Sequence, residues 1–507
     1  MIEAQHAEIE VLRAAQEASQ DVIRRLELRL AEVERRLAMD SSNSGTPTSK
    51  EGIAASEGRK ARQRSGRERS KDRKRGGQPG HQGKGLKRDP DPDDRETADP
   101  PAGCRSCRAP LDGADPAEPR WAQVIDVEIL RKVTEVLLPG LACGGCGTVT
   151  HAPPPPGFHA GSVAYGPVLN AAAVLLSCCG NVPAERSAQL IAMLTGEDVS
   201  PGWVDKAVAR MSGRLRACGF DEAMAAALAA EDVLAADETP VSVLDKAPLP
   251  APAAGDASEA GPEEKAAAGS PHVLVVTTPD ARLRLLLALA SRRKAAVGAG
   301  IPAGFTGYLM TDGYAGYQHL LDRIAGIQQC CQHVIRRCRA VAGLGPGSLQ
   351  SWAEDIIAVL RQAHRAVEGA RARGDTALDP KLLADLLERY DKAVAHGIVH
   401  NRLRDWASGN HPGYSLGCWL REYKEQVFLF TRDFSVDWTN NVSERGAKAA
   451  KRHQAVSGYW HSLATLARWC RIRSYLDSAA AHGVTALDAI RDALTGKPWL
   501  PPLPAVS

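Results

Sequence analysis

The strongest constraint on the fold is an apolar, strand-like run that carries two adjacent acids. In VLAADETPVSVL, residues 233–244, valine, leucine and alanine surround Asp237 and Glu238. An unpaired carboxylate buried in a strand is costly, and burial forces its pKa upward. Side chains alternate along a strand, so the two acids point to opposite faces of the sheet. One of them therefore needs a partner and the other a function, and alternation alone does not decide which.

Further strand-like runs follow this one. They are HVLVVTTP, RLRLLLALASRR and, after a short helical stretch, GYLMTDGY, which ends at Asp312; IQQCCQHVIRRCRAV supplies a fifth strand that leads into a helix. This order predicts an α/β architecture with a mixed sheet, the ribonuclease H-like fold. We expect it over residues 230–490, with a helical insertion at about 345–435, where apolar stripes begin at Trp352 and Leu382. Residues 491–507 are expected to form a C-terminal tail.

The first 40 residues carry apolar positions in a heptad pattern. Isoleucine or leucine recurs every seven residues, with a polar interruption at Gln16 and Ser19. The pattern is typical of a coiled coil that dimerises the chain. An amphipathic helix lying on the protein's own core is the alternative.

Residues 41–100 read as a basic, disordered linker. The net charge of the whole chain is only +3, but residues 59–88 hold 13 lysines and arginines against two acids. Such a segment cannot bury enough apolar surface to fold alone and attracts a polyanion. We expect Arg73, Lys74 and Arg75 to bind DNA.

Two CxxC pairs follow, in a region that we expect to be a zinc-ribbon domain over residues 101–152. Cys104 and Cys107 form the first pair, and Cys143 and Cys146 form the second. Alternating sequence between the pairs predicts paired strands. Four thiolates around zinc make a closed, structural site.

Residues 160–225 are expected to be helical, with segments at 167–179, 183–195 and 201–216. The last two have the spacing of a helix-turn-helix. This spacing is equally consistent with a helix-turn-helix that contacts DNA and with helices that only support the following domain.

A third acid, Glu444, lies in TNNVSERGAKAAKRH, where a final helix is expected to begin. In a ribonuclease H-like sheet, the ends of the first and fourth strands meet one face of a late helix. Asp237, Asp312 and Glu444 would then repel one another, and at least one should take up a proton. Two divalent cations about 4 Å apart would remove that repulsion and activate a water or 3′-hydroxyl. Ligands that are all oxygen favour Mg²⁺ or Mn²⁺.

The same helix offers groups for DNA. Lys448 and Lys451 follow Glu444 on one helical face, where they would hold a phosphate beside the metal or, without metal, pair with Glu444. Asn440 and Asn441 are placed to cap the helix and to offer amides to DNA. The expected DNA-binding residues of this helix are Lys448, Lys451, Arg452, Asn440 and Asn441.

Several motifs occur together in one order: SSNSGTPTS, GGQPGHQGKG, the CxxC pairs, AADETPV, LMTDGYAGY, CCQHVIRRC and TNNVSERGAK. In these motifs the chain resembles, over nearly its whole length, the insertion-sequence-66 family of bacterial DDE transposases. The resemblance implies metal-dependent cutting and joining of transposon ends, with Asp237, Asp312 and Glu444 as the catalytic acids. The resemblance also places Cys330 and His333 beside these acids. The expected role of His333 is to orient a phosphate or to transfer protons, and a purely structural histidine is the alternative.

From these features we expect a transposase. Its partners would be duplex DNA (terminal inverted repeats and target), a second copy of itself or a higher multimer, and accessory proteins of the same element. No apolar run is long enough to span a membrane, and the N-terminal residues do not have the pattern of a signal peptide, which predicts a cytoplasmic protein associated with the nucleoid when bound to DNA. The alternatives are an inactive, DNA-binding regulator derived from a transposase and a structural coiled-coil and zinc-ribbon module. A third alternative is a nuclease of the same fold, which would cut DNA but not join the ends.

Overall fold

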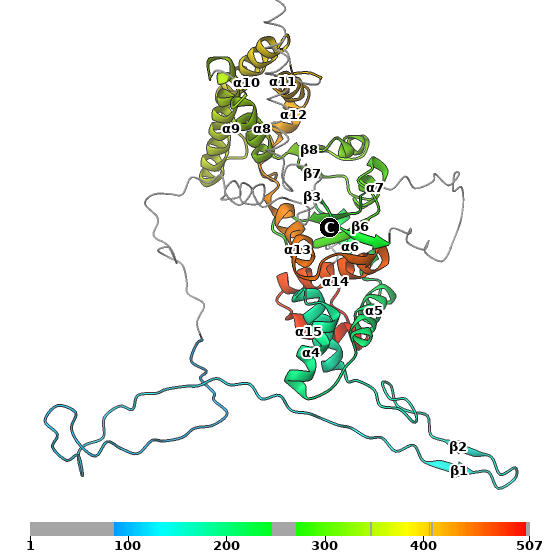
Figure 1. Ribbon diagram of the computed structural model, residues 1–507. Helices are drawn as coiled ribbons and strands as arrows, with labels where there is room; N and C mark the ends of the chain where they lie inside the picture. The colour runs from blue at the N-terminus through cyan, green and yellow to red at the C-terminus, as the bar shows by residue number, and fades with distance from the viewer. Residues whose placement is uncertain (1–85, 246–269, 345–346, 405, 407–408, 503–507) are drawn as a thin grey trace, which may run out of the picture. The chain divides into compact units, whose positions relative to one another are not determined.

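The computed structural model describes residues 86–245, 270–344, 347–404, 406 and 409–502 (Figure 1). The predicted coiled coil, Arg73, Lys74 and Arg75 lie outside these residues. The chain divides into two compact units, Met1–Leu130 and Arg131–Ser507. No helix of the described residues is both long enough and apolar enough to cross a bilayer.

In the first unit, the described residues form neither a helix nor a strand, and Gly103 and Pro110 make one isolated antiparallel bridge. Between the two cysteine pairs, residues 114–139 also form no helix or strand and only Gly140–Ala142 does, so the prediction of two paired strands within this stretch is wrong. Their apolar side chains stay exposed, as at Val124, because no described strand pairs with them. The second unit instead begins with a short hairpin around the second cysteine pair, made by β1 (Gly140–Ala142) and β2 (Val149–His151).

A five-stranded mixed sheet forms the centre of the second unit. The strand order is β6-β5-β3-β7-β8, in which β3 runs antiparallel to β5 and parallel to β7. β5 and β6 are antiparallel, whereas β7 and β8 are parallel. All five lie where the sequence predicts strands: β3 (Val233–Pro240), β5 (His272–Thr277), β6 (Arg284–Leu289), β7 (Tyr308–Thr311) and β8 (Gly326–Gln329). β4 (Val243–Asp245) and β9 (Trp460–Ser462) form a separate parallel pair.

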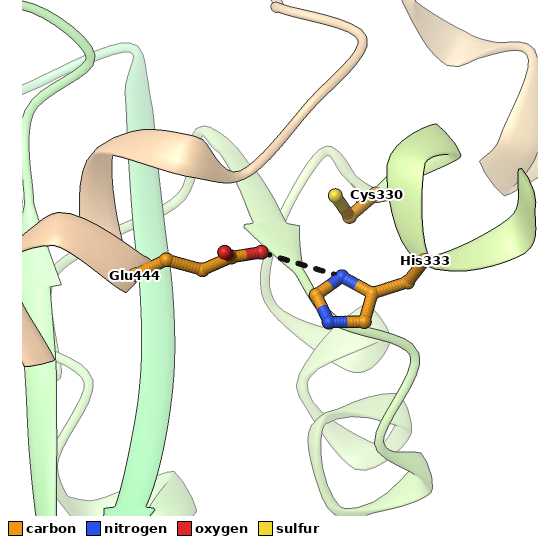
Figure 2. A group of neighbouring side chains, drawn as sticks. All are labelled: Cys330, His333 and Glu444. Carbon is orange, nitrogen blue, oxygen red and sulfur yellow. Dashed lines mark ion pairs between the residues drawn. The ribbon is translucent and has the colours of Figure 1, made fainter. Parts of the chain in front are cut away.

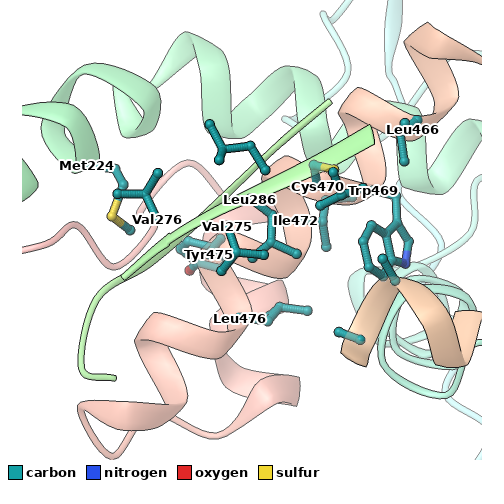
Figure 3. Packing of buried hydrophobic residues seen from close by; sticks show 14 of the residues in the cluster. Met224, Val275, Val276, Leu286, Leu466, Trp469, Cys470, Ile472, Tyr475 and Leu476 are labelled. Atoms are coloured by element: carbon teal, nitrogen blue, oxygen red, sulfur yellow. The ribbon is translucent and has the colours of Figure 1, made fainter. Parts of the chain in front are cut away.

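Helices from both ends of the unit pack with this sheet around one apolar core. Figure 3 shows side chains of that core from α6, β5, β6 and α14. The N-terminal helices are α3 (Pro167–Val174), which continues as a π-helical turn (Leu175–Cys179), α4 (Ala184–Thr195), α5 (Pro201–Ala217) and α6 (Phe220–Ala229). Between β6 and β8 lie α7 (Lys294–Ala299) and a 3₁₀ helix (Ala315–Asp322). The C-terminal helices are α13 (Asn441–Ser457), α14 (Leu463–Ala481) and α15 (Ala486–Leu494).

One final helix was expected from the sequence, whereas three are present. The last of them, α15, extends into the segment expected to be a tail, and the backbone N–H of Trp499 donates to the Tyr475 hydroxyl at 3.2 Å. The tail therefore packs on the core, at least as far as Trp499.

The edge strand β6 is protected by α14. The N–H groups of Arg284 and Leu286 donate to the hydroxyls of Ser478 (3.0 Å) and Ser474 (2.7 Å). An i, i+4 step on a helix is close in length to an i, i+2 step on a strand, so two serines meet two successive outward N–H groups. Open edges invite pairing with other chains, and this helix satisfies the edge instead.

Between α8 (Cys331–Ala342) and α13 the chain is mainly helical. It forms α9 (Gly347–Arg373), α10 (Pro380–Asn401), α11 (Pro412–Glu422), α12 (Lys424–Val427) and a 3₁₀ turn (Leu429–Thr431). The predicted stripe that starts at Trp352 faces a second apolar core, in which Trp352, Ile356 and Leu360 are fully buried. That core is separate from the core around the sheet.

Gly307, just before β7, gives a test of how tightly this sheet is packed. A Cβ at Gly307 would lie 2.1 Å from the carbonyl oxygen of Asp232, which accepts the N–H of Tyr308 at 2.8 Å. We expect Gly307→Ala to lower the free energy of unfolding by about 1–3 kcal/mol, since a backbone atom must move. Urea unfolding followed by tryptophan fluorescence measures this.

Gly304→Ala is the matched control, because its Cβ would meet only the Ala229 Cβ, at an ordinary 3.5 Å. Equal stability of Gly307→Ala and Gly304→Ala would show that the close contact between residue 307 and the Asp232 carbonyl does not restrict the side chain at this position.

Candidate functional site

The sheet register brings two of the three predicted acids to the same place. β3 and β7 are parallel neighbours in which Ala235 faces Met310. Asp237 comes two residues after Ala235 and Asp312 two residues after Met310, directly after the end of β7, so continuing this register places both acids at equivalent positions on one face of the sheet. Glu444 lies in the first turn of α13, the helix that packs on β3 and β5.

The three acids interact electrostatically. The pKa of Asp237 is raised from 3.8 to about 8, first by burial and then by the charges of Asp312, Glu238 and Glu444. Without a cation, the Asp237 carboxyl therefore keeps its proton at neutral pH. The structure thus brings together all three residues that the sequence predicts to be catalytic.

Glu238, the other acid of the pair, has partners of its own. Its side chain is 0% exposed; Arg292 Nε donates to one carboxylate oxygen at 2.5 Å and the Tyr317 hydroxyl donates to the other at 2.6 Å. Arg292 also lies 3.5 Å from Asp312 and 3.8 Å from the centre of the Tyr314 ring, whose hydroxyl donates to the Arg292 carbonyl. Glu238 is therefore a structural acid that holds Arg292 against Asp312.

Sequence reasoning missed Arg292 and Tyr317. Arg292 follows the strand β6 in the stretch SRRK, and a cation at a strand end near predicted acids was an available signal. For Tyr317 no such signal exists, because its contact with Glu238 spans 79 residues of sequence.

Asn440 joins α13 to the sheet. Its side-chain amide donates to the Ala236 carbonyl at 2.7 Å, and its backbone N–H donates to the Cys330 sulfur at 3.2 Å. The residue is 0% exposed and its side chain makes no capping bond to α13. Asn440 therefore occupies the N-cap position of α13 without a side-chain capping bond, and the predictions that its side chain caps the helix and contacts DNA are corrected, because it is buried and its amide nitrogen donates to β3. Asn441 is exposed.

Cys330 and His333 lie beside Glu444 (Figure 2). His333 Nδ1 is 3.5 Å from Glu444 Oε1, and the donor atoms of all three residues lie within 4.8 Å of one another. Arg336, which the sequence did not single out, lies 3.7 Å from Glu444 and 3.2 Å from His333 Nε2. Burial and the charge of Arg336 lower the pKa of His333, and burial raises the pKa of the Cys330 thiol.

The basic residues of α13 have different surroundings. Lys451 Nζ donates to the Pro240 carbonyl at 2.6 Å, and burial lowers its pKa. Lys448 and Arg452 are exposed. The ion-pair partners of Glu444 among the described residues are His333 and Arg336, so the predicted pairing with Lys448 or Lys451 does not form.

The two CxxC pairs form turns with the same hydrogen bonds. Cys104 N–H donates to the carbonyl five residues later (2.8 Å), and its carbonyl accepts from Arg108 N–H, four residues later (2.9 Å). Cys143 repeats both bonds, at 2.9 and 2.8 Å, and the fourth residue after each of these cysteines has a positive φ. Hydrogen bonds, led by the Cys107 backbone at Cys104 and by the Thr148 side chain at Cys146, lower the pKa of both thiols. Lowered thiol pKa values favour the thiolate that binds metals.

A mixed α/β domain with acids gathered above neighbouring parallel strands has the architecture of a transposase domain that acts on DNA. The family model described as Transposase IS66 family matches residues 162–467, and the chain belongs to that family. No curated protein matches the chain. All three acids, Cys330 and His333 lie inside the matched range, whereas the two CxxC pairs precede it.

The raised pKa of Asp237 predicts how stability depends on pH. Between about pH 4 and pH 8 the native state keeps a proton that the unfolded chain loses, so the free energy of unfolding falls as pH rises. Asp237→Asn removes this dependence. In magnesium-free buffer, we expect the variant to lie close to the wild type at pH 4 and to exceed it by roughly 5 kcal/mol at pH 8, the free energy that corresponds to the raised pKa.

Urea unfolding across this pH range checks the prediction, with Asp322→Asn, an exposed acid, as the control. Added Mg²⁺ at pH 8 should stabilise the wild type more than Asp237→Asn. Parallel pH profiles for the wild type and Asp237→Asn would contradict the burial of this charge.

Proposed function

We propose that the chain is an active DNA transposase in which Asp237, Asp312 and Glu444 form a DDE site for phosphodiester hydrolysis and strand transfer. The observation that carries the proposal is their convergence: two acids at equivalent positions of parallel strands, and a third on the helix above them. The strand order, with the first strand between an antiparallel and a parallel neighbour, supports a ribonuclease H-like fold.

Two divalent cations, Mg²⁺ or Mn²⁺, fit the donor set of these acids. Three carboxylates supply only oxygen ligands, and burial together with the charges of the neighbouring acids raises the pKa of Asp237, which a bound cation would counteract. When bound, such cations would lower the pKa of an attacking water or 3′-hydroxyl and stabilise the leaving oxygen.

The other side chains position this set. Arg292, held by Glu238 and stacked on Tyr314, fixes the orientation of Asp312. Asn440 fixes the start of α13, and with it Glu444, against β3. Lys448 and Arg452 are exposed on the same helix, where their side chains would bind DNA phosphates.

The N-terminal features complete the proposal. Each CxxC turn presents two thiols in a geometry that suits structural zinc, and the basic linker and the leading heptads would add DNA binding and self-association. Residues 101–152, 160–225 and 230–490 are the proposed zinc-ribbon, helical and catalytic domains. Terminal repeats, target DNA and accessory proteins of the same element are the proposed partners.

Substitution of the acids tests the catalytic assignment. Asp237→Asn, Asp312→Asn and Glu444→Gln should each reduce Mn²⁺-dependent cleavage of the element's end DNA by more than about 100-fold, because each removes a metal ligand. Gel analysis of cleaved and joined products measures both activities. Asp322→Asn, an exposed acid outside the proposed ligand set, should retain them. Unchanged cleavage by Asp237→Asn and Glu444→Gln would favour a DDE-independent function.

Lys448 tests the proposed DNA surface. Among the described residues it has no hydrogen bond or ion pair, unlike Lys451, so its charge is available to a phosphate. Lys448→Ala should weaken binding to duplex DNA and lower the slope of log affinity against log salt by about 1. Fluorescence anisotropy over a salt series measures the slope. Lys381→Ala, an exposed lysine on α10, is the control, and an equal slope change for both lysines would argue against a surface centred on α13.

A further inference from the structure

Three donor atoms of different chemistry converge at the start of α8 and α13. They are the Cys330 sulfur, His333 Nδ1 and Glu444 Oε1, which all lie within 4.8 Å of one another (Figure 2). An oxygen-only site for magnesium needs neither a thiol nor an imidazole. The cluster therefore has a composition that the proposed DDE chemistry does not explain.

Two of these atoms are buried without a hydrogen-bond partner. His333 Nδ1 and Glu444 Oε1 are both inaccessible to solvent and face each other at 3.5 Å, too far for a good hydrogen bond. Buried polar atoms that are left unpaired cost free energy, so such a pair indicates a missing partner between them. A cation that binds both atoms satisfies them at once.

The surroundings of Cys330 fit a metal ligand. Its sulfur accepts the backbone N–H of Asn440 at 3.2 Å, and Cys330 itself is the N-cap residue of α8, where the helix dipole favours negative charge. Backbone donors of this kind orient a thiolate ligand and stabilise its charge.

We propose that Cys330, His333 and Glu444 form a site for a thiophilic divalent cation, Zn²⁺ above all, that is distinct from the magnesium site and shares Glu444 with it. Sulfur, nitrogen and oxygen ligands together select zinc over magnesium. On binding, the Cys330 thiol releases its proton to solvent as the metal–sulfur bond forms, and His333 binds in its neutral form. Arg336, half exposed, turns away into solvent to relieve its repulsion by the cation.

A regulatory consequence follows and rests on the proposed function. Glu444 Oε1 cannot serve zinc and magnesium at the same time. Zinc at this site therefore inhibits magnesium-dependent cleavage by withdrawing one of the three acids.

Zinc stoichiometry of the full-length protein tests the site. Zinc is also proposed at the CxxC cysteines, so the readout is a difference: equilibrium dialysis should give one Zn²⁺ more per chain for the wild type than for Cys330→Ala or His333→Gln. With Co²⁺ as the probe, the thiolate charge-transfer absorption should fall in Cys330→Ala. Cys338→Ala, another buried cysteine of α8, is the matched control and should behave as the wild type.

The outcomes separate the two proposals. Equal zinc stoichiometry in all four proteins overturns the zinc site, provided that thermal unfolding shows each variant to be folded. If Cys330→Ala does not fold, the comparison of the wild type with His333→Gln decides. One equivalent lost in both variants, with zinc inhibition of cleavage weakened more than about tenfold in His333→Gln, supports site and consequence. Zinc binding without any magnesium-dependent cleavage by the wild type supports the site and overturns the proposed function.

Discussion

Mutual repulsion of carboxylates is the constraint on which the centre of this protein depends. Parallel pairing of β3 and β7 places Asp237 and Asp312 at matching positions, and α13 adds Glu444 to them. Folding therefore buries Asp237 and brings other acids close to it, and burial first and the neighbouring charges second raise its pKa to about 8. Such an arrangement lowers stability in the absence of cations, and it persists because the surrounding structure holds each acid in place.

Two sets of contacts hold it. In the first set, Glu238 binds both Tyr317 and Arg292, and the Arg292 guanidinium lies 3.5 Å from Asp312. Across the sheet, the fully buried Asn440 joins α13 to both β3 and Cys330. The two adjacent acids of β3 thus have different roles. Asp237 lies with Asp312 and Glu444, whereas Glu238 binds Arg292, whose positive charge partly offsets that of the acids.

Much of this was predictable from short-range patterns, and the remainder depends on contacts that such patterns do not encode. The five strands, the acids and the stripe at Trp352 follow from local alternation and spacing. α14 was missed because it is buried on several sides, between β6 and α5, and so lacks a one-sided apolar stripe. Residues 114–139 show the opposite error, since alternation predicts a strand only when a partner strand exists. The pairing of Glu238 with Arg292 crosses 54 residues, and Asn440 meets Ala236 across 204.

The helical region between α8 and α13 leaves the acids undisturbed because its two ends are tied together. Cys331 N–H donates to the Trp438 carbonyl at 2.9 Å, and Asn440 N–H donates to the sulfur of Cys330. Arg371, at the far end of α9, secures the returning chain through the carbonyls of Phe434 and Val436. The chain thus leaves the sheet after β8 and returns to the same point at α13, so the position of Glu444 is set by contacts at the junction. Helices α9 to α11 take part in this arrangement, because they share their apolar core with α8 and because Arg371 of α9 binds the chain that leads to α13.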